Sequence, residues 1–281
     1  MRQLVGRTAI VTGASRGIGI HIARALALQR MNLVLAARSE VDLEQVAAQM
    51  RALGTKVLAV RCDVANEADR AELVRRAEAE FGEIDVLVNN AGIESTFPYD
   101  RQSPAEIEQI ITVNLTAPML LTRAVLPGMV SRKRGHIVNI ASLAGKVGVP
   151  YGLPYAATKA GLIHFTESLR SEFRGTGVSG SVVCPGFVSE AGMYDDMTKL
   201  SGVKASRLAG TSTPAKVAAA VVKCTRRDRP EMIVNPGPMR VLSAIAELAP
   251  GMFERVFPLF GANALFKKVA IENEARAKAK P

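Results

Sequence analysis

The chain has 281 residues, of which 48% are hydrophobic and 22% are charged, which is ordinary for a soluble globular protein with a substantial core. Its net charge of +10 comes from scattered basic residues, without a basic stripe interleaved with aromatic residues. This distribution argues against nucleic acid as a partner and leaves an anionic cofactor or anionic lipid open.

Cysteine usage and the start of the chain bear on its location. Cys62, Cys184 and Cys224 are odd in number and far apart, so they fit neither a disulfide framework nor a zinc site. We therefore expect free thiols in a reduced compartment and no bound metal. The first residues carry no secretory leader, and no run of about 18 uninterrupted apolar residues offers a membrane span. These features predict a cytoplasmic protein.

Apolar runs and helical patterns alternate along the chain with short links. Strands are predicted at 7–12, 32–37, 56–61, 85–88, 136–141, 178–183 and 231–234. Helices are predicted near 17–30, 39–53, 67–81, 104–132, 154–174 and 214–226. The strands lack alternation, as expected where both faces are covered. The pattern predicts an α/β fold, a Rossmann-type doubly wound parallel sheet of about seven strands in a single domain. Ligands of such sheets bind outside the carboxyl ends of the strands.

A glycine-rich loop joins the first predicted strand to the first predicted helix. Its glycines would let the backbone turn tightly and approach a diphosphate, whose charge the helix start could bind. The spacing G-x-x-x-G-x-G differs from the usual dinucleotide fingerprint, and a plain tight turn is the alternative. The loop residues expected to bind cofactor are Gly13, Ser15, Arg16, Gly17, Ile18 and Gly19.

The end of the second strand indicates which dinucleotide would bind. An NAD site normally places an acidic residue there for the ribose 2′-hydroxyl, but this chain has Ala37 followed by Arg38. Arg38 could pair bidentately with a 2′-phosphate, and Arg16 could reach the same group. We therefore expect NADP(H) rather than NAD(H), the alternative being two solvated surface arginines. Asp63, after the third strand, could accept a hydrogen bond from adenine or cap the next helix.

Three residues near the fifth strand form a candidate catalytic group. Tyr155 and Lys159 are four residues apart on a predicted helix, so they share a face. A neighbouring ammonium should lower the pKa of a phenol, and this suits proton transfer coupled to hydride transfer. Ser142, at the end of the strand, could hold a substrate oxygen. Taken alone, a tyrosine and a lysine at this spacing on a helix would usually be a surface pair.

The motifs together resemble the short-chain dehydrogenase/reductase family over about residues 5–235. The shared features are the loop at 12–19, Asp63-Val64, the run Asn89 to Gly92, Asn114, Ser142, Tyr155 with Lys159, and Pro185-Gly186.

The resemblance implies a role for each matching residue. Tyr155 would be the general acid/base, Ser142 would position the carbonyl oxygen, and Lys159 would lower the tyrosine pKa and bind the nicotinamide ribose. Asn114 would hold a water that relays protons from Lys159. The resemblance also implies cofactor contacts from Val64, Asn90, Ala91, Gly92 and Val188.

One position departs from the family pattern. Four residues past Gly186 the family usually has a threonine that binds the nicotinamide amide, and this chain has Glu190. The change puts the local loop geometry in doubt, although an ionised Glu190 could still accept a hydrogen bond there.

Two segments follow the motif-bearing part. We expect a catalytic domain over 1–237, with a substrate lid at about 190–212 lined by Met193, Tyr194, Met197 and Leu200, unless this segment simply packs. A basic amphipathic tail covers 238–281 and could pack on the protein or lie on an anionic membrane surface. Its apolar residues are Leu242, Ile245, Leu248, Met252, Phe253, Phe257, Leu259, Phe260, Leu265 and Phe266, and its last basic residues are Lys267, Lys268, Arg276, Lys278 and Lys280.

These observations predict an NADP(H)-dependent oxidoreductase that reduces a fairly hydrophobic ketone, aldehyde or 3-oxoacyl group, or oxidises the alcohol. One alternative is a non-catalytic NADP-binding sensor or scaffold, and another is a peripheral-membrane steroid or lipid dehydrogenase. By resemblance we expect a homodimer or homotetramer that forms through the helices carrying Asn114 and Tyr155.

Overall fold

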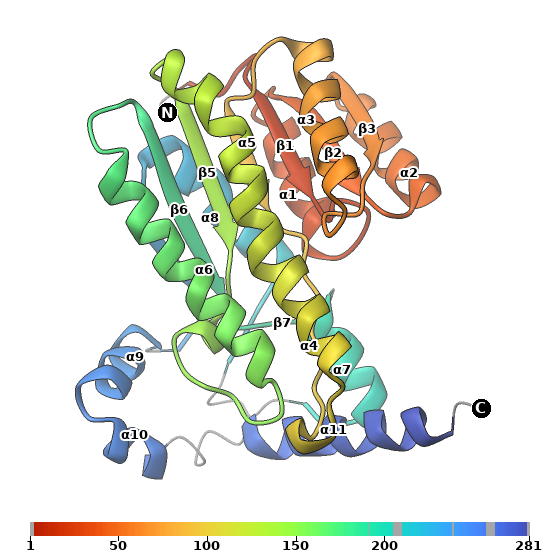
Figure 1. Cartoon of the computed structure of the whole chain (residues 1–281), viewed down its shortest axis with the longest axis vertical. Helices are drawn as coiled ribbons and strands as arrows, with labels where there is room; N and C mark the ends of the chain where they lie inside the picture. Colours follow the sequence, from red (N-terminus) through yellow and green to blue (C-terminus); the bar gives the residue numbers. More distant parts are fainter. Residues whose placement is uncertain (1–2, 191, 205–209, 238, 257–261, 280–281) are drawn as a thin grey trace.

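Seven parallel strands form the central sheet, in the order β3-β2-β1-β4-β5-β6-β9 (Figure 1). The computed structural model describes residues 3–190, 192–204, 210–237, 239–256 and 262–279. The strands are β1 Thr8–Thr12, β2 Asn32–Ala37, β3 Val57–Arg61, β4 Val86–Asn89, β5 Gly135–Ile140, β6 Val178–Pro185 and β9 Glu231–Val234. The predicted single-domain α/β fold with a seven-stranded parallel sheet is confirmed.

The strands are mostly apolar and lack alternation because they contribute side chains to core clusters on both faces of the sheet. Along β1, Val11 belongs to the core cluster on one face and Ile10 to the cluster on the other. Along β2, Leu35 belongs to the same cluster as Val11, and Val34 belongs to the same cluster as Ile10. Successive side chains of a strand point to opposite faces, so a sheet covered on both sides favours apolar residues at successive positions.

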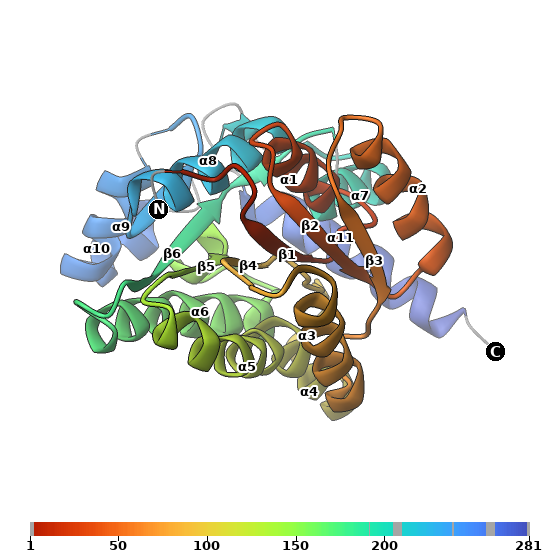
Figure 2. The same ribbon diagram turned by 90° about the horizontal axis from the view of Figure 1, so that it is seen from above.

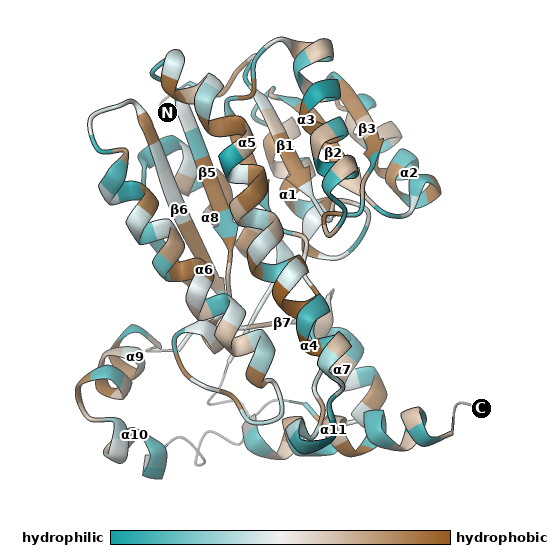
Figure 3. Ribbon diagram, in the orientation of Figure 1, coloured by the Kyte–Doolittle hydropathy of each residue, from teal (hydrophilic) through white to brown (hydrophobic). Residues whose placement is uncertain are grey.

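Helices cover both faces of the sheet (Figure 2). Helices α1 Ile18–Ala27, α2 Glu40–Arg51 and α8 Pro214–Arg227 lie on one face. Helices α3 Glu67–Phe81, α4 Pro104–Ile111, α5 Ala117–Ser131 and α6 Leu153–Glu172 lie on the other. Hydrophobic strands therefore run between helices that carry hydrophilic residues on their outer sides (Figure 3).

The helix predicted over 104–132 contains an irregularity at its middle. A π-helical turn, η2 Thr112–Thr116, joins α4 to α5, and such turns occur often at functional sites. Among the described residues, the continuous stretch Pro104–Ser131 alone is long and apolar enough in composition to cross a membrane. Its residues Leu121 and Val125 are buried in the core cluster beside the sheet, as in the core helix of a globular domain.

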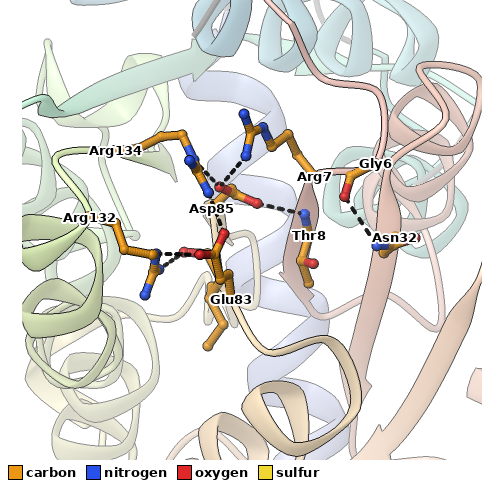
Figure 4. Close-up of polar contacts among 9 residues, drawn as sticks. Gly6, Arg7, Thr8, Asn32, Glu83, Asp85, Arg132 and Arg134 are labelled. Atoms are coloured by element: carbon orange, nitrogen blue, oxygen red, sulfur yellow. Dashed lines mark hydrogen bonds and ion pairs between the residues drawn. The ribbon is translucent and has the colours of Figure 1, made fainter.

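A charged network joins the amino ends of three strands, at the edge opposite the carboxyl ends (Figure 4). Asp85, before β4, accepts hydrogen bonds from the main-chain N–H of Thr8 at 3.0 Å and from Arg134 Nε at 2.7 Å. Arg7 Nη1 lies 3.7 Å from the same carboxylate. Because Asp85 is buried, these contacts compensate the cost of burying its charge and tie β1, β4 and β5 together.

Several elements have no counterpart in the predicted pattern. They are η1 Tyr99–Arg101, η3 Leu143–Gly145, β7 Phe187–Val188, α7 Met193–Ser201, β8 Thr211–Ser212, α9 Met239–Leu248, α10 Pro250–Val256 and α11 Ala262–Lys278. Strands β7 and β8 pair with each other in a small second sheet. Helices α7 and α11 lie beyond the carboxyl ends of the main strands, where a ligand of this fold binds (Figure 1).

Candidate active site

A cleft of about 750 Å³ opens at the carboxyl ends of the strands. It lies where the strand order reverses between β1 and β4, the point at which doubly wound sheets bind ligands. Of the predicted site residues, the following line it: Gly13, Ser15, Arg16, Gly17, Ile18, Arg38, Asp63, Val64, Asn90, Ala91, Gly92, Ser142, Tyr155, Lys159 and Val188. Segments far apart in the sequence therefore meet in one cavity.

At Gly13 and Gly19 the glycine loop packs too closely against neighbouring main chain for a side chain to fit. Gly13 has a φ of 64°, which glycine adopts without strain. A Cβ atom at Gly19 would lie 2.1 Å from the main-chain oxygen of Gly13, so any other residue would displace the loop. Gly19 does not line the cleft itself and instead allows the first turn of α1 to approach β1.

Hydrogen bonds of Asn90 and Thr12 hold this loop in place where the strand order reverses between β1 and β4. Asn90 Nδ2 donates to the main-chain oxygens of Thr12 at 2.9 Å and Gly13 at 3.1 Å. The hydroxyl oxygen of Thr12 accepts from the main-chain N–H groups of Asn90 and Ala91, both at 3.0 Å. Thr12 belongs to the matched loop at 12–19, but the sequence indicated no role for its side chain. Its role is to hold the glycine loop against the end of β4.

Arg16 and Arg38 both lie at one end of the cleft, as predicted. Both side chains are exposed, and neither forms an ion pair with another described residue. Ala37, at the end of β2, lines the same end and leaves no carboxylate at the position typical of NAD sites. Asp42 also lines this end, but it lies one turn into α2, whose N-cap is Ser39. The geometry thus offers two guanidinium groups to an anion.

Asp63 lines the cleft and does not cap the following helix. Its Oδ1 accepts from the N–H of Ala65 at 3.0 Å, whereas Asn66 is the N-cap of α3 and accepts from Asp69. The helix-cap alternative for Asp63 is therefore wrong, because the N-cap lies three residues later, at Asn66. Its remaining acceptor capacity is available to the cleft.

Tyr155, Lys159 and Ser142 meet on one wall of the cleft. Tyr155 and Lys159 lie one turn apart near the start of α6, and Lys159 Nζ is 5.5 Å from the centre of the tyrosine ring. A hydrogen bond joins the hydroxyl groups of Tyr155 and Ser142, which precedes η3. Lys159 is buried, and its ammonium donates to the main-chain oxygen of Ile140 at 2.9 Å. The pair therefore does not lie on the surface.

The protonation of this group differs from the expected direction. Burial raises the pKa of Tyr155 to about 12, while the hydrogen bond to Ser142 acts in the opposite direction. Burial also lowers the pKa of Lys159 to about 8. The expected lowering of the Tyr155 pKa is thus not seen in this structure, because burial has the largest effect on the phenol and raises its pKa. The resting pair is a neutral phenol beside a readily titrated amine.

Asn114 lies behind the cleft rather than in its lining. It is fully buried in the π turn, and its side chain pairs with the main chain of Ile93 in both directions. Its Nδ2 donates to the oxygen of Ile93 and its Oδ1 accepts from the N–H of Ile93, both at 2.8 Å. Nδ2 also lies 3.4 Å from Thr158 Oγ1. The side chain thus fixes the segment after β4 against α6.

Glu190 does not take the place of the family's threonine at the cofactor. It is exposed, does not line the cleft, and adopts a φ of 74° that is uncommon for a residue with a side chain. Ser189 beside it binds the main-chain oxygen of Ser212 through both its N–H and its hydroxyl. The hydrogen bond considered for Glu190 therefore has no support in the structure, because the side chain leaves the cleft.

Helix α7 forms one side of the cleft, and the C-terminal helix α11 packs on it. Met193, Tyr194 and Met197 line the cleft, whereas Leu200 packs in the cluster behind it. Leu265, Phe266 and Val269 of α11 are buried in the same cluster, and Phe266 reaches the cleft. Phe257, Leu259, Phe260 and Lys280 lie outside the described residues. Packing on the protein is thus shown for α11.

Helices α9 and α10 line the cleft with only one of their sides. Met239, Leu242 and Phe253 line it, so this part of the tail also encloses the site. Other apolar side chains of the same helices face outward, and Leu248 is 86% exposed. These helices therefore have an apolar inner side and some uncovered apolar residues on the outer side.

Comparison with known proteins agrees with this geometry. Residues 7–200 match the family model described as short chain dehydrogenase. The chain is 46% identical to ketoacyl reductase HetN of Nostoc sp. over 266 residues, which cover 93% of this chain and 91% of the relative. It is 40% identical to 3-oxoacyl-[acyl-carrier-protein] reductase of Synechocystis sp. over 190 residues, covering 67% of this chain and 77% of the relative.

Two solved structures are also similar. A metagenomic short-chain oxidoreductase in complex with NADP has a TM-score of 0.71 and 37% identity, covering 83% of this chain and 99% of its own. A variant of actinorhodin polyketide ketoreductase with NADPH has a TM-score of 0.76 and 30% identity, covering 84% of this chain and 98% of its own.

Proposed function

This chain is a member of the short chain dehydrogenase family, and we propose that it is an NADP(H)-dependent reductase of hydrophobic ketones or 3-oxoacyl groups. The observation that carries the proposal is the convergence of Tyr155, Lys159 and Ser142 on a cleft whose far end holds the glycine loop and two arginines. Similarity to ketoacyl reductases supports a keto group as the reacting group.

The residues at the far end of the cleft fit a phosphorylated dinucleotide. The glycine loop leaves main-chain N–H groups at the start of α1 for the diphosphate, and Arg16 and Arg38 offer charge to a 2′-phosphate. Asp63 would accept from the adenine amino group, and Val188 would meet the carboxamide through its main chain. NADPH bound in this way would supply the hydride that reduces the carbonyl carbon.

The catalytic residues would handle the proton and the oxygen. Ser142 would donate a hydrogen bond to the carbonyl oxygen, and Tyr155 would give that oxygen its proton as negative charge develops. The neutral resting state of Tyr155 suits this direction, since its proton is in place at neutral pH. Lys159, protonated near pH 7, would stabilise the tyrosinate that remains. In alcohol oxidation the same groups would act in reverse.

Asn114 is better described as a positioning residue than as a catalytic residue. Its side chain is committed to Ile93 and Thr158. A water that relays protons to Lys159 would therefore have to bind its main-chain oxygen in the π turn.

The enclosing residues favour a hydrophobic substrate. Four of the residues that line the cleft with Tyr155 are apolar, namely Met197, Phe253 and Phe266 from three different helices and Val149 from the loop before α6. An apolar chain attached to the keto group would be removed from water there, which favours binding by roughly 25 cal/mol per Å² of apolar surface.

Turnover separates this proposal from the sensor or scaffold alternative. NADPH oxidation is followed at 340 nm with 3-oxoacyl thioesters, 3-oxo esters and aliphatic or cyclic ketones as substrates. The proposal predicts reduction of at least one hydrophobic keto compound with NADPH preferred to NADH. Binding of NADPH without turnover of any of them would favour the sensor or scaffold.

We also propose that the protein is a homo-oligomer. Ile111, Met119 and Leu120 on the helix carrying Asn114 are exposed apolar residues, as is Leu153 at the start of the helix carrying Tyr155. Burying them between copies would remove this surface from water. Light scattering of the purified protein distinguishes a dimer or tetramer from a monomer. The cytoplasmic location stays a prediction.

A further inference from the structure

Glu94 is a carboxyl group inside the cleft that the proposed reaction does not use. It follows Ile93 in the segment after β4 and lines the cleft together with Tyr155. The two groups are close enough for the charge of Glu94 to raise the pKa of the phenol. The other acidic residues of the cleft lie elsewhere, with Asp42 and Asp63 at the arginine end and Asp196 on α7. Glu94 is thus the acid placed beside the reacting position.

The main chain on both sides of Glu94 is held in place. Ile93 is paired with Asn114 through both its N–H and its oxygen at 2.8 Å. Thr96 accepts a hydrogen bond on its main-chain oxygen from Asn273 of α11 at 2.9 Å. The main chain that carries the Glu94 side chain is therefore fixed by hydrogen bonds on both sides, and a residue that selects substrates needs such a fixed position.

Glu94 has little within the described part of the chain to compensate its charge. The hydroxyl of Thr96 donates to its Oε1, and none of the ion pairs among the described residues includes it. Burial accordingly raises the pKa of Glu94 to about 7. Glu94 is half-buried. A carboxylate partly removed from water needs hydrogen-bond donors, and a single hydroxyl supplies one for two oxygens.

We propose that Glu94 is a specificity-determining residue that accepts a hydrogen bond from a hydroxyl or amide N–H of the substrate and excludes substrates bearing a carboxylate near the keto group. The inference rests on the proposed keto reduction. It assigns the substrate to neutral acyl derivatives with a donor close to the carbonyl, because an anion placed beside Glu94 and Tyr155 would meet a like charge at short range.

Three small ligands test separately whether Glu94 repels a carboxylate and whether it accepts a hydrogen bond from the substrate. Acetoacetate and methyl acetoacetate differ in charge, and N-methylacetoacetamide adds an N–H donor to the neutral form. We would measure kcat/KM for each with NADPH at pH 8, where Glu94 is largely ionised. Glu94→Gln removes the charge and keeps an acceptor oxygen for Thr96, while Glu94→Leu removes both. Glu108→Gln makes the same charge change at an exposed site on α4 and is the control.

The expected ratios are specific. Wild type and Glu108→Gln should prefer the methyl ester to the anion by roughly tenfold or more. Like charges several ångströms apart in a partly buried site repel each other by more than about 1.4 kcal/mol, and this energy corresponds to a factor of ten in kcat/KM. Glu94→Gln should bring that ratio to within about threefold, and Glu94→Leu should also abolish the preference for the amide over the ester. An unchanged ester-to-anion ratio in Glu94→Gln overturns the inference.

A second measurement separates this inference from the proposed reaction. Dissociation constants of the same three compounds are measured by calorimetry on protein loaded with NADP⁺, which cannot reduce them, so that binding is observed without turnover. If no compound is reduced, the proposed reaction fails, and the binding ratios of wild type and Glu94→Gln still decide the role of Glu94. Equal binding ratios in the two proteins would count against it even where turnover is normal.

Discussion

Asn273 of the C-terminal helix donates a hydrogen bond from Nδ2 to the main-chain oxygen of Thr96 at 2.9 Å, although 177 positions separate the two residues. An ion pair between Arg101 and Glu274 lies beside it. Together with the burial of Leu265 and Phe266, these contacts make α11 part of the wall of the cleft. A segment outside the residues matched by the family model thereby contacts the loop that carries Glu94.

Asn273→Ala should weaken substrate binding without affecting the cofactor. Loss of one hydrogen bond at a partly buried site costs about 1 kcal/mol, so we expect KM for a hydrophobic keto substrate to rise roughly three- to tenfold. KM for NADPH should not change, because the arginine end of the cleft lies away from α11. Lys268→Ala, an exposed change on the same helix, is the control. Steady-state kinetics measures both constants, and a parallel rise in both would contradict this role for α11.

Tyr155→Phe should remove turnover and leave the nucleotide site intact. The substitution deletes the hydroxyl that is hydrogen bonded to Ser142 and keeps the ring, and general acid catalysis contributes about 10²–10⁴-fold. We expect kcat to fall by at least that factor while the dissociation constant of NADPH, from nucleotide fluorescence, changes by less than about threefold. Tyr151→Phe removes a hydroxyl nearby in the sequence and should retain activity. Substantial activity in Tyr155→Phe would refute the mechanism.

Arg38→Ala should discriminate between the two nicotinamide cofactors. A guanidinium paired with a 2′-phosphate contributes about 1.5–3 kcal/mol, so binding of NADPH should weaken roughly 10- to 100-fold. Binding of NADH, which lacks that phosphate, should change little. Arg24→Ala is the control, because it removes an arginine on α1 that does not line the cleft. Equal losses for both cofactors would show that Arg38 does not recognise the 2′-phosphate.

His136 should make the fold sensitive to acid. It is buried in β5, its Nε2 lies 2.8 Å from Ser181 Oγ, and burial lowers its pKa to about 4. As the pH falls below about 6.5, the unfolded chain binds a proton that the folded histidine refuses until about pH 4, so stability decreases through this window. Urea unfolding should show a loss of roughly 2–3 kcal/mol between pH 7 and 4 that is absent in His136→Gln. His164→Gln, at an exposed site, should keep the wild-type slope.

Asp85→Asn should destabilise the protein by breaking the network at the amino ends of the strands. The substitution leaves the main-chain N–H of Thr8 a possible partner but removes the charge that pairs with Arg134. Breaking a buried ion pair on one side costs about 3–5 kcal/mol, and we expect the lower end because Arg134 also pairs with Glu83. Urea unfolding measures the change. Glu83→Gln, at a half-exposed site, should cost less than about 1 kcal/mol.

Much of the fold and of the cofactor end could be predicted from short-range patterns. The seven strands were recognised because each is a mostly apolar run without alternation, the pattern expected of a sheet covered on both faces. The glycine loop, Arg38 and the Tyr155–Lys159 pair were recognised because each depends on residues within a few positions of one another. The topology then brings their segments to one edge of the sheet, so the cleft follows from the order of the strands.

Features that depend on distant partners were missed or predicted wrongly. The pKa of Tyr155 was expected to fall because the neighbouring lysine is visible in the sequence, whereas the burial that raises it is not. Glu94 gave no signal, since an isolated glutamate in a loop is ordinary until a cavity forms around it. The spacing from Gly186 left open a hydrogen bond from Glu190 to the cofactor, but the Glu190 side chain is exposed and does not line the cleft.

The sequence by itself determined the α/β architecture, the family and the residue types available for chemistry, because these are encoded in local periodicity and in short motifs. Only the tertiary structure decided that α11 returns to the cleft, that Asn114 supports Ile93, and that Glu94 and Tyr155 line the same cleft. These relationships join residues far apart in the chain, and burial and hydrogen bonding between such residues have no trace in local sequence.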